Sequence, residues 1–170
     1  MQKYPRLSVV QLDAHGDLRD SFEGSPLNHA CVMHRILDDG VPIAQVGIRS
    51  LTAEERALIR ERGICTVFAD EAVGSPVEQW IGRVVAALPD EVYVTVDLDA
   101  FDPAIMPATG TPEPGGLDWY RALAVLRAVA RARRIVGFDV VELAPIAGLV
   151  APDFLAAKLV YRLLGYAFQR

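Results

Sequence analysis

Cysteine is scarce in this chain: only Cys31 and Cys65 occur among its 170 residues. The two stand far apart and form no Cys-x-x-Cys pair, which argues against a disulfide framework and against a structural zinc site built from thiolates. Two reduced thiols in a cytoplasmic protein are therefore the simplest interpretation.

Long apolar runs and basic runs are also absent. No stretch reaches the roughly 18 consecutive apolar residues of a membrane-spanning helix. The opening residues, MQKYPRLSVV, lack the pattern of a signal peptide. The formal net charge is −5, without a basic patch. We therefore expect a cytoplasmic protein that binds neither a membrane nor nucleic acid, and that favours neutral or cationic small ligands.

Hydrophobic residues are plentiful instead, at 52% of the chain, which is enough for one domain over residues 1–170 with a substantial core. Five short, almost continuously apolar runs are typical of parallel strands buried on both faces. These runs span 7–12, 42–48, 64–69, 92–98 and 134–143. Helical patterns alternate with them, at 25–40, 51–63, 75–88, 117–134 and 151–168. The alternation predicts a three-layer α/β/α fold with a parallel sheet of about five strands.

Local signals mark several helix starts. Thr52, with Glu55 three residues later, forms a capping box, and Ser-Pro pairs at Ser25 and Ser75 begin two other helical patterns. The one long irregular stretch, residues 99–116, contains four prolines. A loop of that length inside a compact domain is usually functional.

Two strand ends carry alternating acidic residues. Asp13, His15 and Asp17 follow the first apolar run at every second position, and Asp97 and Asp99 end the fourth run in the same way. Alternate residues of an extended chain point to the same side. Either motif alone also fits a polar strand end that caps a turn. Together they indicate a shared cation, because carboxylates this close stay ionised only beside a positive charge.

Four aspartates and one histidine make a hard, mostly oxygen ligand set. Such a set suits Mn²⁺ or Mg²⁺, and the imidazole favours Mn²⁺. More than four ligands indicate two ions that share bridging carboxylates, an arrangement that activates a water molecule and polarises the group it attacks.

Two further residues are candidates for catalysis. His29 lies near the start of the predicted helix at 25–40 and is of the right type to shuttle a proton near neutral pH. A packed or capping histidine is the plainer interpretation. Glu142 ends the fifth apolar run and should point into the same crevice, where it could receive a cationic group of a substrate. Its alternative role is an ion pair with a nearby lysine or arginine.

These residues lie in blocks that resemble the signature of a known family. The blocks LDAHGD, NHAC, VTVDLDAFDPAIMPATGTPEPGG and FDVVELAP are similar to those of the ureohydrolases, the arginase and agmatinase family, over nearly the whole chain. GFDVVEL and APDFLAAKLVYRLLGY look more like agmatinases than arginases. The resemblance implies an arginase/deacetylase-like fold and an enzyme that hydrolyses a linear, agmatine-like guanidino compound to urea and an amine, using a hydroxide that bridges two Mn²⁺ ions.

The resemblance also implies a role for each metal-ligand candidate. Asp13 and Asp97 would bridge the two ions. His15 and Asp99 would complete the shell of one ion, and Asp17 would bind the other.

For the substrate side, the resemblance implies three more roles. His29 corresponds to a proton-shuttling histidine. Glu142 corresponds to the carboxylate that holds the guanidinium, and Thr111 would lie close to it as a second substrate-binding residue.

One block of the family is missing from this sequence. Ureohydrolases carry a Gly-Gly-Asp/Glu-His-Ser block whose histidine is a metal ligand, yet only twelve residues, none of them histidine, precede Asp13. We therefore expect an N-terminally truncated fold in which the ion held by Asp17 binds weakly. The strands that begin at 134, 92, 7, 42 and 64 should lie side by side in that order. Their topological switch point should bring Asp13 next to Asp97.

Two alternatives to an active ureohydrolase stay open. The chain could be a truncated, inactive module that binds metal or a partner chain, which the missing histidine supports. It could also be a metal-dependent deacylase of the related deacetylase-like fold, although DAHGD lacks the paired histidines of that group. With the strands of the missing N-terminal portion absent, the strand IVGFDVV at 135–141 would form an uncovered apolar edge, which predicts self-association into a homo-oligomer or poor solubility.

Overall fold

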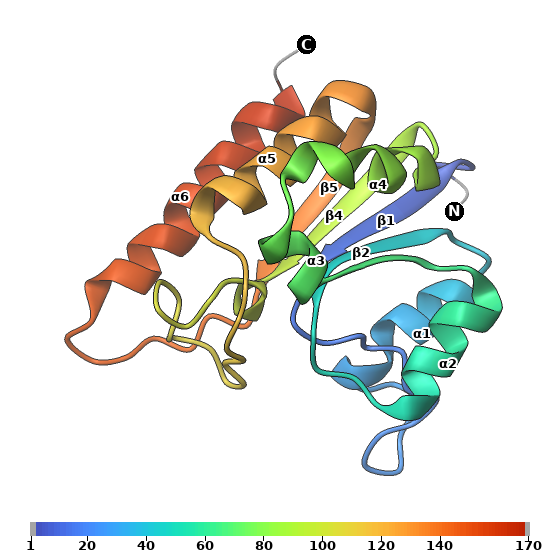
Figure 1. Ribbon diagram of the computed structural model, residues 1–170, viewed down its shortest axis with the longest axis horizontal. Helices are drawn as coiled ribbons and strands as arrows, with labels where there is room; N and C mark the ends of the chain where they lie inside the picture. The colour runs from blue at the N-terminus through green and yellow to red at the C-terminus, as the bar shows by residue number, and fades with distance from the viewer. Residues whose placement is uncertain (1–2, 169–170) are drawn as a thin grey trace.

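A computed structural model describes residues 3–168 (Figure 1). Its five strands form one parallel sheet in the order β3-β2-β1-β4-β5. They span Leu7–Leu12 (β1), Ile43–Ile48 (β2), Cys65–Phe68 (β3), Glu91–Asp97 (β4) and Arg134–Val141 (β5). The α/β class, the parallel sheet and the strand order predicted from the sequence are confirmed.

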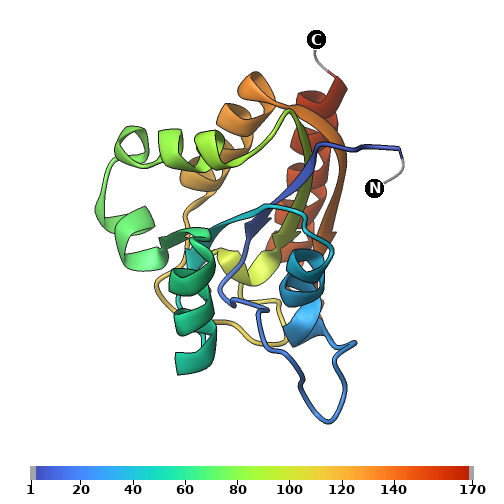
Figure 2. The same ribbon diagram turned by 90° about the vertical axis from the view of Figure 1, so that its right-hand side faces the viewer.

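Helices cover both faces of this sheet (Figures 1 and 2). α1 (Val32–Asp38) and α2 (Ala53–Arg62) lie on one face. The other face carries α3 (Ala69–Gly74), α4 (Ile81–Ala87), α5 (Trp119–Ala132) and α6 (Val150–Phe168). Short 3₁₀ turns η1, η2 and η3 lie at His29–Cys31, Val77–Gln79 and Leu98–Ala100. None of the helices in residues 3–168 is long and apolar enough to cross a membrane.

The core follows from the alternation of side chains along the strands. In β4, Val92, Val94 and Val96 are fully buried against the layer formed by α4, α5 and α6, whereas Tyr93 and Thr95 face the opposite side and are half-buried. Burial of one such valine contributes roughly 1.5–3 kcal/mol relative to its exposure to water. The helices α1 and α2 pack over β1 to β3, so β4 and β5 keep a partly exposed polar face on that side.

Two predicted helices differ from the structure. The pattern at 25–40 becomes helical only at η1, because Ser25 pairs with Phe22 in a tight turn and the Asn28 side chain, not a serine, caps the first turn by accepting from the Ala30 amide. The pattern at 75–88 breaks at Trp80, whose ring is completely buried and whose φ of −124° leaves the helical range. Burial of this large ring in the core thus interrupts the helix, which is divided into η2 and α4. The short helix α3 was not predicted.

The topology gathers three loops at one end of the sheet. From β1 the chain proceeds outward through β2 and β3, then crosses to β4 on the other side of β1 and continues to β5. The loops that follow β1, β4 and β5 therefore meet at the carboxyl ends of the strands, which is the usual ligand position in such a sheet (Figure 1).

Candidate active site

Asp13, His15 and Asp99 meet at the switch point between β1 and β4. The His15 Nδ1 atom lies 3.0 Å from Asp99 Oδ2 and 3.5 Å from Asp13 Oδ1. One potential ligand atom from each residue lies within 4.8 Å of the others, as a metal-binding group requires. The two carboxylates are buried and the imidazole is half-buried.

Turns, not extended strands, bring these side chains together. β1 ends at Leu12, and the Asp13 carboxylate then accepts a hydrogen bond from the His15 amide at 2.6 Å. Asp99 lies in the 3₁₀ turn η3, where its Oδ1 accepts from the Ala14 amide at 3.0 Å and so ties the two loops to each other. The expectation that alternate residues of a strand converge here is therefore wrong in its geometry.

Asp17 and Asp97 lie beside this group, in a cavity of about 570 Å³ that His15 and Asp99 also line. Asp17 has a left-handed backbone conformation with φ 53°, which non-glycine residues seldom adopt. Its carbonyl accepts a hydrogen bond from the Met33 amide at 3.0 Å, at the start of α1, which fixes this conformation. Backbone strain of this kind is often found at functional sites.

Burial makes the ionised carboxylates unfavourable. It raises the pKa of Asp17 to about 8 and that of Asp97 to about 9, and in both cases the negative charge of Asp13 adds to the effect. Burial also raises the pKa of Asp13. For Asp99 the burial effect is outweighed by hydrogen bonds from His15 and from the Ala14 amide, so its pKa is lowered.

The His15 imidazole is the positively charged partner of these carboxylates. Hydrogen bonds to Asp13 and then to Asp99 raise the pKa of His15 to about 10. With all four carboxyl groups ionised, the cluster would hold more negative charge than its one cation neutralises, and a divalent ion would relieve that imbalance.

Exposed residues form the rim of the same cavity. The Thr111 hydroxyl donates to Asp99 Oδ2 at 3.3 Å. Glu142 follows β5 with a left-handed φ of 64°, and no lysine or arginine of residues 3–168 forms an ion pair with it. The His29 ring packs edge-on against Phe22, with 5.8 Å between the ring centres. Seven of the eight site candidates taken from the sequence line this one cavity, and the eighth, the buried Asp13, contacts His15 beside it.

The arginase family model matches residues 1–165. The chain belongs to the arginase family. The resemblance inferred from the sequence blocks is therefore confirmed.

Individual members agree with this assignment. An N(1)-aminopropylagmatine ureohydrolase of Synechocystis is 48% identical over 94% of this chain and 52% of its own length. An agmatinase of Pyrococcus horikoshii is 40% identical over 93% of this chain and 54% of its own length. The crystal structure of the agmatine ureohydrolase of Thermoplasma volcanium matches with a TM-score of 0.83 and 33% identity, over 95% of this chain and 55% of that one. The chain thus spans about half the length of these relatives, which are ureohydrolases and not deacylases.

A buried chain of polar side chains supports the site of this arginase-family protein from below. The Thr66 hydroxyl donates to Gln45, Gln45 Nε2 donates to Gln11 Oε1 at 2.7 Å, and Gln11 Nε2 donates to Asp13 Oδ2 at 2.8 Å. Three neighbouring strands thereby orient one carboxylate. The signal in the sequence is a glutamine inside each of two apolar runs, which the motif pattern does not single out.

Arg49 and Glu55 hold the surrounding loops, and both lie outside the sequence blocks that resemble the family. The half-buried Arg49 guanidinium donates to the carbonyls of Asp99 and Glu113, each at 2.7 Å, and so fixes the loop after η3. Glu55 closes the predicted capping box of α2 and also accepts from the Leu18 amide at 2.9 Å. One carboxylate thus links the helix to the loop that carries Asp17.

Proposed function

We propose that this chain provides the metal centre and substrate cavity of an agmatinase-like ureohydrolase, which hydrolyses a linear guanidino compound to urea and an amine. The observation that carries this proposal is the cluster of four carboxyl groups around one imidazole, with Asp13 and Asp99 buried and Asp17 and Asp97 half-buried. Isolated burial of such charges costs several kcal/mol per ion, and a cation offsets that cost.

The donor set fits divalent ions. Asp13, His15 and Asp99 offer ligand atoms close enough for one ion. Asp17 and Asp97 line the cavity beside that group, and burial together with the charge of Asp13 raises the pKa of both. A second cation nearby would stabilise their ionised forms. Carboxylates with one imidazole suit Mn²⁺, so we propose that these five residues would hold two Mn²⁺ ions. The ion at Asp17, which lacks the histidine ligand of the missing block, would bind more weakly.

The residues on the rim would bind and orient the substrate. Bound divalent ions supply Lewis acidity that activates a water molecule at neutral pH. The Glu142 carboxylate would receive the guanidinium group, and the Thr111 hydroxyl, already bonded to Asp99, would position it above the metal centre. The exposed His29 would donate the proton that the departing amine needs.

An acidic groove next to the cavity supports a substrate with a cationic tail. This groove, of about 530 Å³, shares Arg19, Thr52 and Glu55 with the metal cavity and also contains Glu54 and Glu61. Relatives named N(1)-aminopropylagmatine ureohydrolases act on a longer polyamine than agmatinases do. We propose that the groove accepts such an extended amine tail. Glu61→Gln should then raise the KM for N(1)-aminopropylagmatine but not for agmatine, and the exposed Glu78→Gln is the matched control.

The direct test is urea release from agmatine and from N(1)-aminopropylagmatine with added Mn²⁺, with Asp97→Asn as background. Urea formation well above that background supports the proposal. A protein that binds Mn²⁺ but releases no urea above background would instead be an inactive metal-binding module. A single tightly held Mn²⁺ per chain, with no second, would favour the same alternative.

We also propose a homo-oligomer in the cytoplasm. β5 is a long edge strand in the described sheet; its last residue, Val141, is an exposed apolar residue, and Leu143 and Ile146 just beyond it are exposed as well. The opposite edge, β3, has only four residues, and short edge strands discourage pairing. Both cysteines are free, in keeping with a reducing compartment. A strictly monomeric protein in light scattering at high concentration would contradict the self-association.

A further inference from the structure

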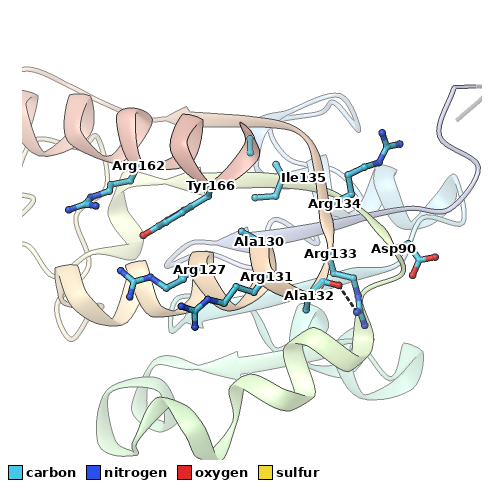
Figure 3. A pocket seen from close by; sticks show the side chains of 11 residues that line it. Asp90, Arg127, Ala130, Arg131, Ala132, Arg133, Arg134, Ile135, Arg162 and Tyr166 are labelled. Atoms are coloured by element: carbon cyan, nitrogen blue, oxygen red, sulfur yellow. Dashed lines mark hydrogen bonds between the residues drawn. The ribbon is translucent and has the colours of Figure 1, made fainter. Parts of the chain in front are cut away.

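A second large groove lies at the other end of the sheet, far from the metal centre. It has a volume of about 840 Å³ and runs between α5 and α6, next to the amino end of β5. Five arginines line it: Arg127, Arg131, Arg133, Arg134 and Arg162. Figure 3 shows the side chains of Arg127 and Arg131 projecting from α5 and that of Arg162 projecting from α6, with Tyr166 between Arg162 and Arg127 in this view.

Two of these arginines have structural partners and three do not. Arg133 donates to the carbonyls of Leu88 and Val85, and Arg134 pairs with Glu91. Within residues 3–168, no carboxylate pairs with Arg127, Arg131 or Arg162. In a chain with a net charge of −5, three unpaired guanidinium groups around one groove are unexpected.

Helix stability does not account for the cluster. Arg127 and Arg131 are four residues apart on α5, where like charges repel. Arg131 lies in the last turn of α5 and benefits from the helix dipole, but Arg127 lies one turn earlier and Arg162 lies in the middle of α6, beyond the range of that effect. The Tyr166 hydroxyl, one turn after Arg162, is shielded from water and has no hydrogen-bond partner among the described residues.

An aromatic cavity continues the groove toward the start of α6. It has a volume of about 470 Å³ and shares Arg162 with the arginine groove. Trp119, Phe154 and Tyr161 line it. Phe154 and Tyr161 are 61% and 69% exposed, which is unusual for aromatic side chains. The Lys158 ammonium also lines the cavity and lies over both rings, 5.6 and 5.5 Å from their centres, so a flat ligand would stack on the exposed ring surface that Lys158 does not cover and would meet a further positive charge.

We propose that the groove between α5 and α6 binds a nucleoside polyphosphate. The phosphates would lie on Arg127, Arg131 and Arg162, since planar guanidinium groups match phosphate oxygens in bidentate geometry. The Tyr166 hydroxyl would donate a further hydrogen bond. The base would stack on Phe154 or Tyr161, because aromatic rings accept any base by its flat face. The ligand would thus lie along the groove with Arg162 at the junction of its two parts.

The test is calorimetric titration of the full chain with ATP, inorganic tripolyphosphate and adenosine, in buffer with a chelator and no added metal. We expect saturable one-to-one binding of ATP, weaker binding of tripolyphosphate and none of adenosine alone. Arg127→Gln and Arg162→Gln should each weaken both anions about tenfold or more. Phe154→Ala should weaken ATP but leave tripolyphosphate unchanged.

Two matched variants separate this site from general charge attraction. Arg62→Gln removes the same charge from the last turn of α2, outside the groove, and should leave ATP binding unchanged. Tyr166→Phe keeps the charge and should still weaken both anions severalfold. Absence of saturable ATP binding, or equal losses in Arg62→Gln and Arg162→Gln, would overturn the proposal. Equal affinity for ATP and tripolyphosphate would overturn its nucleoside part. Unchanged melting temperatures of the variants establish that they are folded.

Discussion

The two ends of the parallel sheet differ in the sign of their charged side chains and in how far those side chains are buried. At the carboxyl end, Asp13 and Asp99 are buried and fixed by hydrogen bonds. At the amino end, Arg127 and Arg162 project from helix surfaces into an open groove. Buried like charges cost several kcal/mol unless an ion neutralises them, whereas exposed charges are screened by water and salt. The carboxyl end should therefore depend strongly on its ligand, and the amino end should respond in small, graded steps.

The largest effect is expected for Asp97→Asn at the carboxyl end. This change removes one charge and one oxygen ligand from the proposed bridge, so it should lower Mn²⁺ affinity and urea release by more than about 100-fold. Calorimetry with Mn²⁺ and a urea assay measure both. The exposed Asp39→Asn carries the same change of charge away from the site and should behave like the wild type. Comparable losses in both variants would show that general charge, not the site, is responsible.

Metal should also stabilise the fold by a large amount. At a free Mn²⁺ concentration about 100 times its Kd, linkage predicts roughly 2.7 kcal/mol of additional stability. For a domain of this size, that corresponds to an increase in Tm of about 5–10 °C. Thermal unfolding with Mn²⁺ and with a chelator measures the shift. Arg131→Gln at the amino end should show the full increase, and Asp97→Asn little of it.

Gln11→Leu should have an intermediate effect on the metal centre. The leucine fills a similar volume but removes the hydrogen bond that orients Asp13, and it takes away one of the two acceptors of Gln45 Nε2, which keeps its hydrogen bond to the Gly16 carbonyl. Loss of a residue that orients a metal ligand typically costs about 10–100-fold in affinity. Mn²⁺ titration of Gln11→Leu and of Gln11→Glu measures this effect, and wild-type affinity in Gln11→Leu would exclude an orienting role.

A pH dependence of stability is expected in the metal-free protein. Folding raises the pKa of Asp17 from 3.8 to about 8, of Asp97 from 3.8 to about 9, and of His15 from 6.5 to about 10. The folded state therefore binds more protons than the unfolded state, and stability must fall as pH rises. Between pH 6 and 9 the free energy of unfolding should decrease steadily, as urea denaturation can measure.

Saturating Mn²⁺ should flatten or reverse this slope, because the ion binds the deprotonated carboxylates and displaces their protons. A metal-free protein whose stability rises over the same pH range would contradict the assignment of these groups as buried and electrostatically unbalanced.

The sequence predicts the framework well because its signals are local. Continuous apolar runs define the strands, and the capping box of Thr52 and Glu55 gives the start of α2 to within a residue. The break at Trp80 could not be predicted, since it depends on how one large ring fits the assembled core. The motif residues were found by their chemistry, but the left-handed turn at Asp17 was not, because it is held by amides of α1, a separate element. The same holds for Arg49, whose partners lie some 50 to 65 residues later.

The free edge of β5 lies next to the cavity that Glu142 lines, so a strand that pairs with β5 would also change the shape of that cavity. Among residues 3–168, no strand pairs with the outer side of β5, and Glu142 directly follows its last residue. All strands of this sheet run in the same direction, so a further strand that joined β5 in parallel would end level with Glu142. The loop after that strand would become an additional wall of the substrate cavity. Selectivity for the guanidino substrate would then be a property of the assembled sheet, adjustable by whichever polypeptide completes it.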